Sequence, residues 1–169
     1  VDTQYNTPVT PTLSGSATTV TINQGRITIS KSTDTPTANI PLGASNVTLA
    51  KFNFYAGGEP VKLRFLPITI TRTASTAAAS TVDIRNISVV DDVGNSVGTT
   101  VSSGDAWTAG SSTSSIAVNF GTSSSYINYI IPANTTRVLS VKVDVQSAAN
   151  ATTLAASLAT PSSANLEGQ

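Results

Sequence analysis

The sequence predicts an all-β protein, an antiparallel β-sandwich of roughly eight to ten strands in an immunoglobulin-like or jelly-roll-like arrangement. Apolar and polar residues alternate along most of the 169 residues, and Val, Ile, Thr, Phe and Tyr carry the alternation. Helical periodicity is nearly absent, and turn signals recur about every 10–15 residues. A closed barrel is less favoured because the predicted strands are uneven in length.

The first segments alternate between strand and turn patterns. Residues 17–23 and 27–29 predict strands on either side of a Gln-Gly turn. Residues 33–43 hold Asp, Asn, Gly and two prolines, which predicts a loop or an irregular edge. Residues 46–56 predict a strand with two phenylalanines on one face, and the Gly-Gly-Glu-Pro run at 57–60 predicts the next turn.

Residues 61–72 predict a strand that changes its buried face. Its apolar residues fall at odd positions up to Phe65 and at even positions from Leu66 onward. Pro67 follows at once, and a proline cannot donate a ladder hydrogen bond. We therefore predict that the chain kinks here and crosses from one sheet to the other.

The second half of the chain continues the strand-and-turn pattern. Further strands are predicted at 82–91, 99–102, 116–120, 126–131, 137–146 and 153–158. Loops or turns are predicted at 73–80, 92–95, 103–115 and 132–134. The strand at 137–146 is the clearest, since its alternate residues predict an inward and an outward face. The inward residues are Leu139, Val141, Val143 and Val145, and the outward residues are Ser140, Lys142 and Asp144.

The composition excludes several classes of function. The chain has no His and no Cys, which excludes Ser-His-Asp triads, thiol nucleophiles and zinc sites built on these residues. Nine basic residues balance nine acidic ones, so no electrostatic footprint for nucleic acid is present. No apolar run approaches the roughly 20 residues of a membrane span. We therefore expect no enzyme, no cofactor and no membrane span.

The composition also predicts where the protein works. Ser and Thr together make 50 of the 169 residues, and charged residues only 11%. With no cysteine, this composition favours an extracellular or cell-surface protein. We expect three regions: an extended N-terminal strand or tail at 1–16, the sandwich domain at 17–159, and a C-terminal linker or tail at 160–169.

The N-terminal region 1–16 has its own alternation and no turn signal before Gly15. Thirteen extended residues span about 43 Å, enough to cross a sandwich from end to end. It predicts a donor strand that completes the sheet of a neighbouring subunit, and head-to-tail contacts of this kind build a fibre. Its large apolar residues are the predicted subunit-interface plugs: Val1, Tyr5, Val9 and Leu13. The alternative is a tail folded onto its own domain, and Pro8 and Pro11 count against a central position in a sheet.

Four groups of motifs follow one another between Val20 and Leu158. They are GRITISKS at 25–32 with DTP at 34–36, VTLAKF at 47–52 with AGGEPV at 56–61, ISVVDD at 87–92 with VG at 97–98, and IPANTT at 131–136 with LSVKVD at 139–144. In this order they resemble a repeat module of bacterial cell-surface proteins, of the kind found in ultrasmall candidate-phyla bacteria. The resemblance implies a structural role in a stalk, surface layer or fibre and no catalytic residue.

Two further groups of residues are candidate ligand sites. Asp91, Asp92 and Asn95 surround a glycine and carry the oxygen atoms that calcium prefers, although the same residues are common in hairpin turns. Trp107, in a glycine-containing loop, is a candidate to stack on a sugar, together with Tyr126 and Tyr129. The alternative for Trp107 is a cap on one end of the core.

Four asparagines begin Asn-x-Ser/Thr sequences and are candidate glycosylation sites: Asn46, Asn86, Asn134 and Asn150. A chain this rich in Ser and Thr contains about this many such sequences by chance. The function predicted overall is a self-polymerising structural subunit, partnered head-to-tail with its own copies. The alternative is a carbohydrate-binding or adhesive module of a larger surface protein, with surface glycans as partners.

Overall fold

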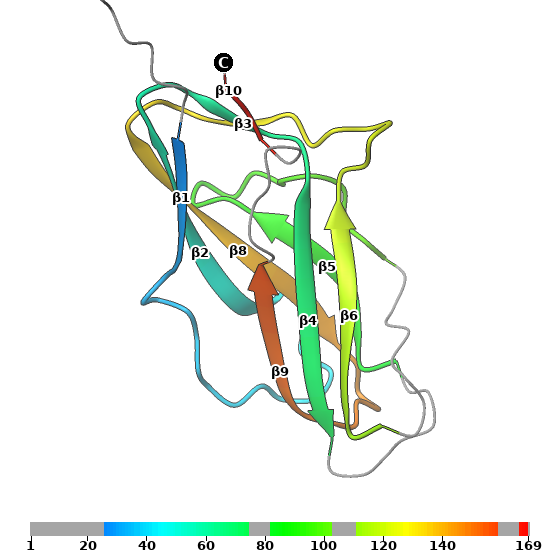
Figure 1. Ribbon diagram of the computed structural model, residues 1–169. Helices are drawn as coiled ribbons and strands as arrows, with labels where there is room; N and C mark the ends of the chain where they lie inside the picture. The colour runs from blue at the N-terminus through cyan, green and yellow to red at the C-terminus, as the bar shows by residue number, and fades with distance from the viewer. Residues whose placement is uncertain (1–25, 75–81, 103–110, 159–165, 169) are drawn as a thin grey trace, which may run out of the picture.

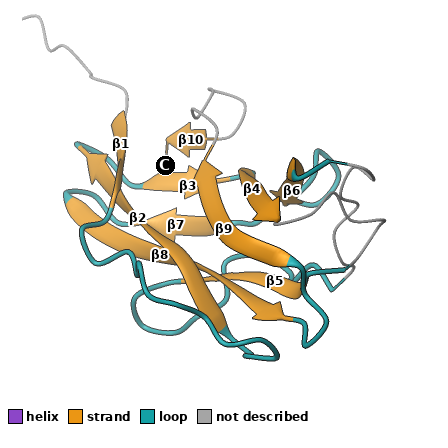
Figure 2. Ribbon diagram, turned by 90° about the horizontal axis from the view of Figure 1, so that it is seen from below, coloured by secondary structure: helices purple, strands orange, loops and turns teal. Residues whose placement is uncertain are grey.

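The computed structural model describes residues 26–74, 82–102, 111–158 and 166–168. These residues form β-strands and connecting loops and no helix, as Figure 2 shows. The strands are β1 (Arg26–Lys31), β2 (Val47–Gly57), β3 (Val61–Leu63), β4 (Leu66–Ala74), β5 (Ile84–Val90), β6 (Thr113–Phe120), β7 (Tyr129–Ile131), β8 (Thr135–Val145), β9 (Ala151–Leu158) and β10 (Leu166–Gly168). The predicted all-β class is confirmed.

The strands pair into three antiparallel sheets, in the orders β1-β2-β8-β5, β6-β4-β9 and β10-β3-β7. The first two sheets form the layers of a sandwich-like fold, with β9, β4 and β6 in front of β2, β8 and β5 in Figure 1. The short third sheet lies at one end. The sheets are open and do not close into a barrel, which agrees with the favoured prediction.

The core lies between the two layers and follows from the alternation in the sequence. Ile68 and Ile70 of β4 and Leu139 and Val141 of β8 are all at most 1% exposed and belong to one apolar cluster. Ser140 was predicted to face outward, but it is buried. Because β8 is a central strand, the neighbouring side chains of β2 and β5 on either side cover this small residue.

The crossing predicted between Phe65 and Leu66 is confirmed. β3 ends at Leu63 in the end sheet, and β4 begins at Leu66 in a sandwich layer. Pro67 pairs with β6 on one side and lies just beyond the residues that pair with β9 on the other. The proline therefore stands at the end of the strand, where a missing donor costs least.

Four expectations about single segments differ from the structure. The strand predicted at 126–131 begins only at Tyr129, as β7. Residues 99–102 make one isolated bridge, Val101 to Ile87, instead of a strand. The predicted loop at 103–115 ends earlier, since β6 begins at Thr113. The region 160–169, expected to be a linker, contains β10, which pairs with β3. Pairing with a distant strand decided each outcome. The predicted strand at 17–23 and the N-terminal region 1–16 lie outside the described residues.

Candidate functional site

An open groove of about 910 Å³ runs along one side of the sandwich. It lies between β9, the first residues of β2 and the segment 32–46 that connects β1 to β2. In Figure 1 this connecting segment sweeps from the lower end of β1 around the side of the molecule on which β9 lies. The volume is at the upper end of the range for ligand pockets, so the groove is large enough for a segment of peptide.

Both strands that border the groove present unpaired backbone to it. Among the described residues, β9 is hydrogen-bonded to β4 only, so its other edge is open. The β1 strand pairs with residues 52–57 of β2, and no other strand of the described ranges pairs with residues 47–50 on that side. Such edges carry unsatisfied N–H and C=O groups and are templates for another strand.

The outer wall of the groove is held at its two ends. The Thr35 hydroxyl donates to the Lys51 carbonyl oxygen and accepts from the Lys51 N–H, both at 3.1 Å. Val145 donates its N–H to the carbonyl oxygen of Ala44 at 2.8 Å. Between these ties the wall exposes two large apolar side chains to the groove, Ile40 at 36% and Leu42 at 60%.

The inner side chains of β9 are apolar and only half-buried: Leu154, Ala156 and Leu158. Leu49 and Val47 of β2 add apolar surface at the floor, and Lys31 is the only charged residue of the lining within the described part of the chain. Apolar side chains beside open strand edges are the two features that bind an extended peptide. The sequence analysis placed interface residues on the N-terminal region and missed this groove. The sequence offered only a weak strand pattern at 153–158 and a separate loop at 33–43, and nothing local places the two segments side by side.

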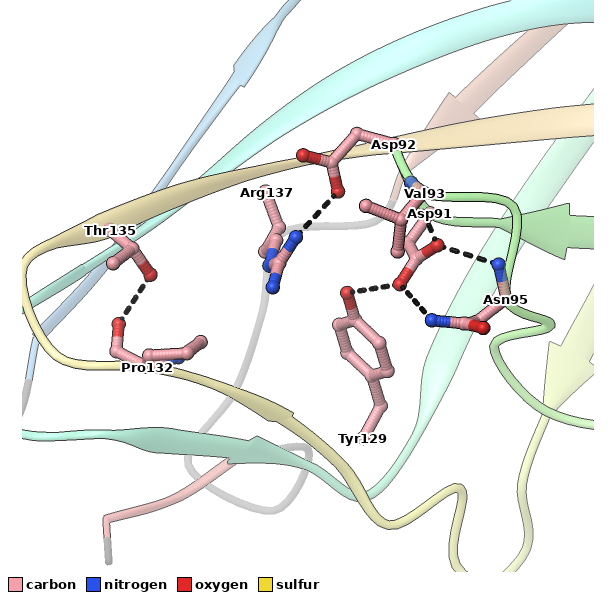
Figure 3. A network of polar contacts seen from close by, with 8 residues as sticks. All are labelled: Asp91, Asp92, Val93, Asn95, Tyr129, Pro132, Thr135 and Arg137. Atoms are coloured by element: carbon pink, nitrogen blue, oxygen red, sulfur yellow. Dashed lines mark hydrogen bonds and ion pairs between the residues drawn. The ribbon is translucent and has the colours of Figure 1, made fainter.

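Asp91 lies at the centre of a polar network after β5 (Figure 3). Its carboxylate accepts hydrogen bonds from the N–H groups of Val93 and Asn95 and from the hydroxyl of Tyr129, at 3.1, 2.7 and 3.1 Å. Burial by itself raises the pKa of Asp91, but these hydrogen bonds outweigh it and hold the pKa below its usual value. The pKa of Tyr129 is raised to about 12, by burial and then by its hydrogen bond to Asp91.

This network gives Asp91 and Asn95 the turn roles that were the alternative to calcium binding. The nearby Asp92 carboxylate lies 3.1 Å from the Arg137 guanidinium. Within the described ranges, no three acidic, His or Cys side chains cluster to hold a metal ion. A cation at Asp91 and Asp92 would have to compete with these donors, so the calcium prediction draws no support from the geometry.

The predicted sugar-stacking residues are not brought together as one platform. Trp107 lies outside the described residues. The Tyr129 hydroxyl is engaged by Asp91 at 3.1 Å. Tyr126 is 40% exposed, packs edge-on against Phe65 with ring centroids 5.3 Å apart, and has the Arg64 guanidinium 5.1 Å from its ring centroid. Of the three predicted residues, Tyr126 is therefore the one that the structure describes as exposed.

Three of the four candidate glycosylation residues have positive φ angles, near 51–57°: Asn46, Asn86 and Asn134. Asparagine tolerates this left-handed conformation better than most residues. The Asn86 amide donates to Asp144 at 2.7 Å, and the Asn134 amide oxygen accepts from the Gly58 N–H at 3.2 Å. These asparagines thus have structural roles that explain their presence. The backbone N–H of Asn150, the fourth, donates to Asp83 at 2.6 Å.

A buried ion pair joins the two layers of the sandwich. Arg72 of β4 contacts Asp83, which precedes β5, and both side chains are fully buried. Asp83 also accepts the backbone N–H of Asn150, at the start of β9. The pair links three segments across the core. Its position between the layers gives it a structural role.

Comparisons with protein-family models, with curated proteins and with solved structures find no match to this chain. The described residues contain no helix at all, and so none of the length and apolarity needed to cross a membrane.

Proposed function

We propose that this protein is a structural subunit of an extracellular filament or cell-surface assembly and that its copies join by strand complementation. An extended N-terminal strand of one copy fills the groove beside β9 of the next. The observation that carries the proposal is the open groove itself, which combines the unpaired edge of β9 with half-buried apolar side chains. A bound strand would satisfy the edge of β9 and cover the apolar surface.

The positions of the chain start and of the groove favour pairing between copies. β1 begins at Arg26, opposite Gly57 at the end of β2, whereas the groove reaches Val47 at the beginning of β2. The ten steps between Val47 and Gly57 separate these positions by roughly 33 Å. In a head-to-tail stack, an N-terminal region that continues away from the Arg26 end of one copy meets the groove end of the next copy without turning back. Such head-to-tail contacts do not close and generate a filament.

Electron microscopy of the purified chain, beside a version lacking residues 1–13, tests this proposal. Long regular filaments from the intact chain and monomers from the shortened chain are the expected result. Monodisperse particles from both would contradict it. The four predicted plugs, Val1, Tyr5, Val9 and Leu13, lie within the deleted stretch.

A carbohydrate-binding or adhesive module is the second candidate, because the exposed ring of Tyr126 lies beside the Arg64 guanidinium. Aromatic faces with a neighbouring donor are the usual stacking surface for sugars. Glycan-array binding that is lost in a Tyr126→Ala variant and survives deletion of residues 1–13 would favour this function. Binding that the Tyr126→Ala variant retains would exclude this tyrosine.

A further inference from the structure

The length of the groove limits how much of the N-terminal region it can hold. The groove follows β9 from Ala151 to Ala156, five steps or about 17 Å at ~3.3 Å per residue. Val1 and Tyr5 are four residues apart, about 13 Å in an extended strand, so both fit. Val9 would lie about 26 Å from Val1, beyond the groove. One groove therefore holds two neighbouring plugs and not four.

The prolines decide which two plugs these are. The longest proline-free run within residues 1–16 is Val1–Thr7. Pro8 and Pro11 stand at positions of opposite parity, so a strand containing both directs one missing N–H toward β9 whichever way it faces. The run Val1–Thr7 keeps every donor that an open strand edge requires.

Charge sets the direction of the bound strand. Asp2 is the only charged residue in 1–16, and Lys31 is the only charged residue among the described residues that line the groove. Lys31 lies at the end of the groove nearest β1, opposite Phe52, whereas Val145 and Ala151 lie at the other end. A strand with Asp2 beside Lys31 runs toward Val145.

That direction is antiparallel to both bordering strands. β8 ends at Val145, and β9 begins nearby at Ala151. The β9 strand therefore starts at the end of the groove where the bound strand would end, so the two strands run in opposite directions. β2 also begins at this end, because Val47 pairs with Val143. Antiparallel ladders are slightly more stable per residue than parallel ones. In this direction, the bound N-terminal strand leaves the copy whose groove it fills at the end opposite Gly57, which faces the copy that donates the strand.

We infer that residues Val1–Thr7 of a second copy occupy the groove as a strand antiparallel to β9, with Asp2 beside Lys31. The side chains of Val1 and Tyr5 then face the interior, and those of Asp2, Gln4 and Asn6 face solvent. This inference rests on the proposed function and names the partner segment and its register. The residues beyond Thr7 serve as the connection to the body of the donor copy.

Disulfide trapping in the full-length chain tests the register, because the chain has no cysteine of its own. The test variant carries Asp2→Cys with Lys31→Cys, and the matched control carries Thr12→Cys with Lys31→Cys. Both pairs use an even-numbered position of the N-terminal region. After mild oxidation with copper phenanthroline, the test variant should give a ladder of covalent multimers on non-reducing gels, and the control should stay monomeric.

Two results would overturn the inference. One is a ladder from the control without a ladder from the test variant. The other is a fast-migrating, internally linked monomer of the test variant, which would place the segment in its own groove. Electron microscopy of the same samples separates the two proposals. Filaments without a 2–31 cross-link overturn the register and leave strand complementation standing, whereas absence of both filaments and cross-links overturns both.

A charge exchange gives a second measurement that needs no cysteine. Asp2→Lys and Lys31→Glu should each raise the critical concentration for assembly about two- to fivefold, as expected for an exposed ion pair. The double variant should restore the original value. Failure of the double variant to recover, with both single variants impaired, would contradict the pairing of Asp2 with Lys31.

Discussion

Replacing Leu42 by aspartate puts a carboxylate into the wall of the groove at a position that is already open to solvent. The Leu42 side chain is 60% exposed. Full burial of a leucine contributes about 1.5–3 kcal/mol, so a docked strand that covers the exposed part gains about 1–2 kcal/mol from this residue. The aspartate variant loses that gain, and docking of the strand must also desolvate its carboxylate, which is unfavourable.

The loss can be read directly from assembly. In an elongating filament, the critical concentration equals the dissociation constant for subunit addition, and about 1.4 kcal/mol changes it tenfold. Leu42→Asp should therefore raise the critical concentration about 5–30-fold. Sedimentation of filaments over a concentration series, checked by electron microscopy, measures this value.

Val93→Asp is the matched control. Val93 is 66% exposed, similar to Leu42, but it lies in the turn after β5 and does not line the groove. Both variants should unfold within about 0.5 kcal/mol of the parent chain, as is usual for exposed substitutions. An unchanged critical concentration for Leu42→Asp, or an equal rise for Val93→Asp, would refute the reasoning.

Three other predictions concern the fold. Asp83→Ala should cost about 3–5 kcal/mol in chemical denaturation, because it leaves the Arg72 guanidinium buried without its carboxylate. Gly121→Ala should cost about 1–3 kcal/mol, since Gly121 has a φ angle of 80° and an added Cβ meets the carbonyl oxygen of Arg64. The pKa of Tyr129 rises from 10.0 in the unfolded chain to about 12, so its contribution to stability is complete below pH 10 and is lost toward pH 12. Between pH 10 and pH 12, the free energy of unfolding should therefore fall less in Tyr129→Phe than in the parent chain. Denaturation at a series of pH values measures this.

Each of these has an outcome that contradicts it. The Arg72→Met, Asp83→Leu double variant should be much more stable than Asp83→Ala, and equal stabilities would show that the ion pair is not the cause. Gly94→Ala has a similar φ angle, 90°, and open space for its Cβ, so an equal cost at Gly94 would exclude the contact at Gly121. Parallel pH profiles of Tyr129→Phe and the parent chain would refute the role of Tyr129.

The lowered pKa of Asp91 predicts a second pH dependence, in which the protein loses stability as the pH falls. A carboxyl group whose pKa is depressed in the folded protein contributes stability above its ordinary value of 3.8, and this is lost as pH falls through the folded value. The Tyr129 hydroxyl is one of the donors that depress it. Tyr129→Phe should therefore also reduce the loss of folding stability at low pH. The same denaturation series, extended to acid pH, measures this.

Local patterns in the sequence were sufficient for most strands. The alternation at 46–56 and 137–146 corresponds to β2 and β8, and the phase change between Phe65 and Leu66 marks the crossing between sheets. Side-chain parity is a property of consecutive residues, so it can be read without knowing the partner strand. Arg72 shares the parity of Ile68 and Ile70 and is buried like them, but nothing local identified Asp83 as its partner.

The sequence by itself determined that this chain forms alternating strands, where they turn and where one of them changes sheets, because these follow from neighbouring residues. Only the tertiary structure decided which edges stay open. The groove brings residues 151–156 beside residues 47–50, which are distant in the chain, and β10 exists because residues 166–168 find β3. Which strand edges find a partner depends on contacts between segments far apart in sequence, and no local pattern records them.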